Sequence, residues 1–132
     1  MKKAIIALLI LAVCGVLYLT FQGPAETIHL SEMVKEFVGY RGNLLQFRSD
    51  VHYFEYFIVG TVLAVLGLSM KWRAWIPGII GCIFGLLDEV IKILLPTREF
   101  GSLDLIKDCI GTWTAISLVY AFNRVFKERK NP

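Results

Sequence analysis

Charged residues of types that can bind an anion or transfer a proton interrupt the apolar sequence over Leu86–Asp108. The acidic pair Asp88 and Glu89 precedes Lys92, and Arg98 follows a proline-containing connection. Adjacent carboxylates in a low-dielectric pocket can hold different protonation states, so that one donates and the other accepts a proton. Lysine and arginine suit a phosphate or a carboxylate, which arginine binds in bidentate geometry. The stretch therefore indicates an anion-binding pocket or acid–base chemistry.

Small residues share helical stripes with several of these charges. At 3.6 residues per turn, Gly81 and Gly85 align with Asp88, and Gly111 aligns with Asp108. Small residues let a second helix approach closely, so these stripes are expected to face protein and not lipid. We therefore predict that three apolar runs bring their polar ends into one pocket. The predicted pocket residues are His52, Glu55, Tyr56, Asp88, Glu89, Lys92, Arg98, Asp104 and Asp108.

The composition around these charges indicates a membrane protein. Of the 132 residues, 56% are hydrophobic and only 19% are charged, and the mean hydropathy is +0.62, outside the range of an ordinary soluble domain. The length accommodates one domain of about four helical crossings, because each crossing needs ~20 mostly apolar residues. We predict an all-α integral membrane bundle, one domain over residues 1–132. Its four transmembrane helices are Ala4–Phe21, Tyr53–Met70, Trp75–Leu95 and Leu103–Phe122.

Basic residues predict the orientation of the bundle, because lysine and arginine favour cytoplasmic loops. They precede the first span at Lys2 and Lys3, join the second and third spans at Lys71 and Arg73, and follow the fourth span. Of the 11 acidic residues, only Glu128 falls on that side. We predict a multi-pass protein of the bacterial cytoplasmic membrane with both termini cytoplasmic. The first run is long enough to be an uncleaved span and not a signal peptide.

The segment between the first two spans predicts a short interfacial helix. Apolar residues recur at helical spacing from Leu30 to Val38, and Glu32, Lys35 and Glu36 occupy the opposite face. A helix of this kind can lie in the outer interface of the membrane. Its role is either that of a lid or that of a plain connector.

Three motifs resemble the VanZ family of small bacterial membrane proteins. They are "VHYFEYFIVG" (Val51–Gly60), "LLDEVIK" (Leu86–Lys92) and "PTREFGSLDLIKDCIG" (Pro96–Gly111). The order and spacing of these motifs cover the chain after about Ser49. The chain departs from the family pattern at Lys92, Thr97 and Asp108, and the changes at Lys92 and Asp108 add charge.

The resemblance implies a set of positions but no reaction. The founding member of the family is associated with resistance to the glycopeptide teicoplanin. By residue, the resemblance implies functional roles for His52, Tyr56, Asp88, Glu89, Arg98 and Asp104, and packing roles for Gly60 and Gly111.

Several functions stay open at this level. The first is binding of an anionic, lipid-linked cell-envelope precursor or a lipid headgroup, reached from the outer leaflet. The second is a hydrolase or transferase that acts on the lipid's phosphate or sugar, with a divalent cation held by Asp88, Glu89, Asp104 and His52. The third is a salt-bridge network that fixes helix register. We favour binding, because no nucleophile elbow, His-Glu-x-x-His helix or phosphate-binding glycine loop is present.

Other ligand classes have weaker support. The acids lack a diagnostic metal-ligand spacing, so we predict no metal-binding residues, and the sequence does not determine a cofactor or an oligomeric state. Cys14, Cys82 and Cys109 lie in separate predicted spans, a scatter that fits buried apolar filler better than a zinc motif or a disulfide framework. A basic cytoplasmic tail is what the topology already requires, so we predict no nucleic-acid binding.

Overall fold

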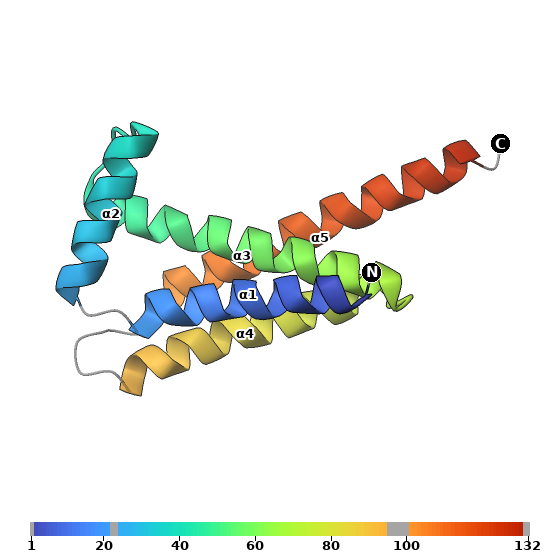
Figure 1. The fold of residues 1–132 in the computed structure, drawn as a ribbon, viewed down its shortest axis with the longest axis horizontal. Coiled ribbons are helices and arrows are strands. Elements are labelled where there is room, and N and C mark those ends of the chain that lie inside the picture. The colour runs from blue at the N-terminus through green and yellow to red at the C-terminus, as the bar shows by residue number, and fades with distance from the viewer. Residues whose placement is uncertain (1, 22–23, 95–100, 131–132) are drawn as a thin grey trace.

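The computed structural model describes residues 2–21, 24–94 and 101–130, and the regular structure in these ranges is helical only. The helices are α1 (Lys2–Phe21), α2 (Pro24–Val38), α3 (Leu44–Ser69), α4 (Trp75–Leu94) and α5 (Ser102–Lys130). Figure 1 shows α1, α3, α4 and α5 running along the length of the molecule, with α2 lying across one end. The prediction of an all-α fold is therefore confirmed for the described residues.

Two helices contain a segment that is long and apolar enough to cross a membrane, namely Asp50–Ser69 and Ser102–Arg129. Helix α1 contributes a shorter apolar segment, Ile6–Gly15, and α4 carries three ionisable residues in its last two turns. Helix α3 begins ahead of the predicted boundary at Tyr53, because Asn43 caps it. The Asn43 side chain accepts a hydrogen bond of 2.7 Å from the backbone N–H of Gln46.

Close approach of α3 and α5 forms the centre of the bundle. A Cβ atom at Gly60 would lie 2.8 Å from the backbone of Thr112, and one at Gly111 would collide with the carbonyl oxygen of Tyr53. Each helix thus presents a glycine to the backbone of the other, the arrangement that lets helices pack without side chains between them. The prediction that Gly60 and Gly111 are packing positions is confirmed.

The polar stripe of α4 faces the other helices. Its buried residues are Pro77, Gly78, Gly81, Gly85, Asp88, Glu89 and Lys92. A Cβ atom at Gly81 would collide with the Thr112 side chain, and one at Gly85 would lie 3.1 Å from Cβ of Asp108. The prediction that this stripe faces protein is confirmed, and it brings the charges of α4 against those of α5.

The segment predicted as an interfacial helix is α2, which begins earlier than predicted, at Pro24, and ends at Val38. Gly39 adopts a left-handed conformation (φ 69°), and the N–H of Tyr40 bonds the carbonyl of Lys35 at 3.1 Å, an arrangement typical of helix C-termini. Several apolar side chains of α2 are exposed, and Phe37 is 92% exposed. Much of its described apolar face is therefore not covered by the bundle.

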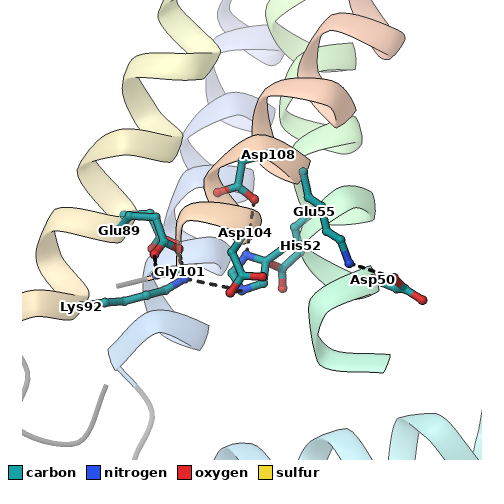
Figure 2. Close-up of polar contacts among 10 residues, drawn as sticks. Asp50, His52, Glu55, Glu89, Lys92, Gly101, Asp104 and Asp108 are labelled. Carbon is teal, nitrogen blue, oxygen red and sulfur yellow. Dashed lines mark hydrogen bonds and ion pairs between the residues drawn. The ribbon is translucent and has the colours of Figure 1, made fainter. Parts of the chain in front are cut away.

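The two ends of the bundle differ in charge. Helix α1 begins and α5 ends at the end of the bundle opposite α2 (Figure 1). The basic residues Lys71 and Arg73 lie in the turn between α3 and α4, which is tied to α5 by a 3.0 Å hydrogen bond from the Tyr120 hydroxyl to the Trp72 carbonyl. The acidic residues Asp50, Glu55, Asp88, Glu89, Asp104 and Asp108 lie at the α2 end, whereas Glu128 lies near the opposite end of α5. Figure 2 labels Asp50, Glu55, Glu89, Asp104 and Asp108 close together.

Candidate functional site

The ammonium group of Lys92 joins the polar residues of α4 to α3. Its Nζ donates a hydrogen bond to Oε1 of Glu89 and lies 3.2 Å from Oδ2 of Asp88. It also lies 3.4 Å from Nε2 of His52 on α3. The helical spacing of the three α4 residues allows these contacts, because positions three and four apart share a face. All three α4 side chains are buried.

Asp108 on α5 faces the same cluster from the opposite side (Figure 2). Its side chain has no solvent exposure, and its Oδ1 lies 3.4 Å from Nδ1 of His52. Within the described ranges, neither carboxylate oxygen of Asp108 accepts a hydrogen bond. Burial of a carboxylate without hydrogen-bond donors is unfavourable, so this group is set for a partner with positive charge.

Glu89 and Asp104 connect the cluster to the start of α5. The backbone N–H of Gly101 donates a 2.8 Å hydrogen bond to Oε2 of Glu89, which ties α4 to the residue before α5. Asp104 is half-buried, and its Oδ2 lies 4.0 Å from Nε2 of His52. Glu55 approaches the same imidazole from one turn along α3, with Oε2 3.9 Å from Nδ1. His52 therefore lies among carboxylates from α3 and α5.

An apolar cavity of about 210 Å³ adjoins the cluster. Its lining residues come from α1, α3 and α4 and are Val13, Tyr56, Val59, Phe84, Leu87, Asp88 and Ile91. Asp88 is the one charged residue among them, and it also contacts Lys92. An apolar cavity of about 150 Å³ is enough to bind benzene, so this one has room for part of a hydrocarbon chain.

A second polar group lies beside the cluster and was not anticipated from the sequence. The Tyr40 hydroxyl donates a 2.8 Å hydrogen bond to Oδ2 of Asp50, and Nζ of Lys107 donates one of 3.1 Å to Oδ1. This outer bridge of Tyr40, Asp50 and Lys107 joins the α2–α3 connection, α3 and α5. The hydrogen bond to Asp50 raises the pKa of Tyr40 above its ordinary value, because it holds the phenol in its protonated form.

The structure brings together most of the residues predicted to form the pocket, and Arg98 lies outside the described residues. Tyr56 is buried below the cluster and lines the cavity. Sequence reasoning missed Thr112, whose buried hydroxyl oxygen has no hydrogen-bond partner among the described residues. A single threonine in an apolar run does not indicate from the sequence that its hydroxyl is buried without a hydrogen-bond partner. The functional role of the predicted residues stays a prediction.

Four residues of the cluster have the geometry to hold a metal ion. His52, Asp88, Glu89 and Asp108 each offer one donor atom, and these atoms lie within 4.8 Å of one another. The sequence predicted no metal-binding residues, and only its hydrolase or transferase alternative placed a cation on Asp88, Glu89, His52 and, in place of Asp108, Asp104. Depth in the bundle explains the difference, because Asp104 lies in the first turn of α5 and is partly exposed, whereas Asp108 lies one turn further in and is fully buried.

Comparisons with known proteins leave the chain unassigned. No protein-family model matches the sequence, and neither the curated proteins nor the solved structures contain a similar one. The resemblance to the VanZ family therefore stays a prediction from the three motifs.

Proposed function

We propose that the chain is a VanZ-like, four-span protein of the bacterial cytoplasmic membrane that binds an anionic lipid-linked cell-envelope precursor, or a lipid headgroup of the same phosphate chemistry. Both termini are cytoplasmic, and the polar cluster opens toward the outer leaflet. Binding there changes how the lipid is exposed or handled and in this way contributes to glycopeptide (teicoplanin) resistance. Part of the support comes from the sequence motifs, and part comes from the molecule's surface and cavity.

The exposed apolar surface supports a lipid environment for all four long helices. Leu11 on α1 is 67% exposed, and Ile93 on α4 and Phe122 on α5 are also exposed. Water-soluble proteins seldom leave so many large apolar side chains exposed along entire helices. A helix of 20 residues, the length of α1 and α4, is about 30 Å long, which equals the thickness of the hydrocarbon core.

The apolar cavity that ends at Asp88 is the observation that carries the binding proposal. A lipid phosphate is an amphipathic ligand, which needs an apolar surface for its chain beside a polar group for its head. The cavity offers the first, lined by Val59 and Phe84, and the buried cluster offers the second. Binding sites generally combine a mostly apolar wall with a few placed polar groups in this way.

Lys92 and Arg98 are the cations that we assign to a bound phosphate. Lys92 lies inside the cluster, and Arg98 follows α4 in the sequence. Arginine binds phosphate through two parallel hydrogen bonds, so Arg98 is the residue that we assign to the headgroup. The carboxylates near Lys92 exceed its charge.

Mass spectrometry of lipid retention tests the proposal. The purified protein in lipid nanodiscs is incubated with undecaprenyl phosphate or with undecaprenol, the neutral alcohol of equal chain length, each with and without divalent cation. We expect the phosphate to be retained in preference to the alcohol, and Arg98→Ala to abolish that preference. Val13→Phe, which narrows the cavity, is expected to weaken retention, whereas Val125→Phe on an exposed position of α5 is its matched control.

The other outcomes of this experiment discriminate the alternatives. A product mass that appears only with the unmodified protein would establish a hydrolase or transferase and overturn a pure binding role. Equal retention of phosphate and alcohol would contradict headgroup recognition, and absence of both would leave the cluster as a salt-bridge network that fixes helix register.

A further inference from the structure

The buried cluster holds more negative charge than its own cation balances. Asp88, Glu89 and Asp108 are each at most 3% exposed, and Lys92 is the cation in contact with the first two. Three carboxylates and one ammonium leave an excess of two negative charges among these four residues. Buried charge is stable only when it is paired, so a divalent cation would bring this group to neutrality.

The spacing of the donor atoms fits one ion. The donors of His52, Asp88, Glu89 and Asp108 lie within 4.8 Å of one another. Ligands bonded to one zinc ion at roughly 2.0–2.2 Å lie at most about 4.4 Å apart, so the cluster needs to contract only slightly around an ion. The four residues come from α3, α4 and α5, which pack against one another, and binding would therefore join three helices.

The oxygens of Asp108, which accept no hydrogen bond from the described residues, are an independent observation that points to a ligand. Its carboxylate is fully buried, lies beside Gly85 of α4, and accepts no hydrogen bond from any described residue. Figure 2 shows it directed toward the imidazole of His52, one of the other donors. A carboxylate that only fixed helix register would be expected to accept hydrogen bonds from its neighbours.

The position of Lys92 shows where a cation is bound in this cluster. Its Nζ contacts Glu89 and Asp88 and lies 3.4 Å from Nε2 of His52, so three of the four donor residues surround one ammonium group. A metal ion at this point would displace the ammonium, whose flexible stem can carry it aside. Lys92 would therefore compete with the metal ion.

We propose that His52, Asp88, Glu89 and Asp108 form a binding site for a divalent ion of the first transition row, such as Zn²⁺ or Mn²⁺. Imidazole suits zinc, and carboxylates suit manganese, whereas calcium and magnesium prefer oxygen ligands alone. The bound ion bridges the buried carboxylates to a lipid phosphate, which explains how a cluster with excess negative charge accepts an anion. The bridging role rests on the proposed function, but the metal site itself does not.

Metal retention without lipid tests the site. The full chain in detergent is stripped with a chelator, loaded with Zn²⁺ or Mn²⁺, desalted, and analysed by inductively coupled plasma mass spectrometry. We expect about one ion per chain, and a loss in affinity of at least about tenfold for Asp108→Asn, the effect that even outer-shell substitutions reach. Asp50→Asn is the matched control, because it removes a carboxylate at the same end of the bundle that belongs to the outer bridge and is outside the donor set.

Lys92→Met sharpens the test, because removal of the competing ammonium should increase metal affinity. Size-exclusion chromatography checks that each variant is folded, and the Mn²⁺ electron paramagnetic resonance signal of the unmodified protein reports binding without any substitution. No retained ion in either the unmodified protein or Lys92→Met would overturn the proposal. Equal losses in Asp50→Asn and Asp108→Asn would also overturn it, because they would indicate nonspecific attraction to negative charge.

Metal retention and lipid retention can fail separately. A bound ion together with equal retention of undecaprenyl phosphate and undecaprenol would support the metal site and contradict the proposed function. Preferential retention of the phosphate by a chelator-stripped protein would support the proposed function and contradict the bridging role.

Discussion

Two neighbouring groups of charged residues at the α2 end of the bundle differ in burial and in balance. In the outer bridge, Asp50 is partly exposed and receives hydrogen bonds from both Tyr40 and Lys107. In the buried cluster, Asp108 is fully enclosed and accepts no hydrogen bond from the described residues. Both groups connect α3 to α5. The carboxylate of Asp50 accepts hydrogen bonds, whereas the carboxylate of Asp108 accepts none from the described residues.

This difference separates a structural role from a ligand-binding one. A partly exposed ion pair contributes little to stability and mainly holds side chains in place. A buried group with excess charge is costly, and a molecule that keeps it gains something other than stability. The outer bridge therefore fits a structural role in positioning the α2–α3 connection, and the buried cluster fits the ligand-binding role that we propose for it.

Lys92→Met should produce the largest loss of stability. Removing one partner of a buried ion pair costs about 3–5 kcal/mol, because the carboxylates of Asp88 and Glu89 stay buried without their cation. Unfolding in mixed micelles, in buffer free of metal ions, measures the effect, and Lys127→Met on an exposed position of α5 is the control. If Lys92→Met were as stable as the parent chain, the ammonium would not balance the cluster.

Gly111→Ala should have the next largest effect and should disturb both groups together. The added methyl group would collide with the carbonyl oxygen of Tyr53, and overpacking of this kind costs about 1–3 kcal/mol. Unfolding in mixed micelles, in buffer free of metal ions, measures this loss of stability as well. Gly15→Ala on α1 is the matched control, since a Cβ atom there meets nothing within 4 Å. An unchanged stability of Gly111→Ala would contradict the close packing of α3 on α5.

Thr112→Val should change the stability by less than about 1 kcal/mol, or increase it, in metal-free buffer. Its hydroxyl is buried without a partner among the described residues, and replacing such a group by one of the same shape is nearly neutral. Thermal unfolding of the two proteins side by side provides the comparison. A clear loss of stability would instead reveal a partner for the hydroxyl and extend the buried cluster by one turn of α5.

The outer bridge should respond to alkaline pH with the smallest effect. The pKa of Tyr40 is raised in the folded chain, so its contribution to stability is present below its unfolded pKa and is lost as the pH rises through the folded value. An absorbance titration of phenolate formation compares the parent with Tyr40→Phe. The phenolate absorbance of the parent minus that of Tyr40→Phe reports Tyr40 alone. This difference should increase only above pH 10, the ordinary pKa of tyrosine. A difference curve centred at or below that value would show that Asp50 does not hold the phenol.

Local patterns in the sequence predict much of this fold. Continuous apolar runs predict the helices. The spacing of Gly81 and Gly85 predicts the face of α4 that packs on other helices. Both predictions succeed because they depend only on residues within a few turns of one another. The helix boundaries were less accurate. Asn43 starts α3 well before the apolar run, and α5 continues through polar residues to Lys130.

The partners within the site depend on how the helices pack and on how deep in the bundle each residue lies, which the sequence does not encode locally. Asp104 and Asp108 are equivalent in spacing, but only Asp108 is fully buried and joins the donor set with His52. Lys107 and Asp50 meet across 57 positions of chain, and no short-range pattern links them. Such pairings are set when α3 and α5 pack, and they require the structure.

Photo-crosslinking in living bacteria tests the central claim, that the cavity beside the buried cluster selects an anionic lipid. Benzoylphenylalanine replaces Phe84, which lines the cavity, or Leu118, an exposed residue of α5, and mass spectrometry identifies the adducts. We predict anionic lipid phosphates, enriched in the polyprenyl-linked class, at position 84 and the bulk membrane lipids at position 118. The same lipid mixture at both positions would contradict a selective site for an anionic lipid.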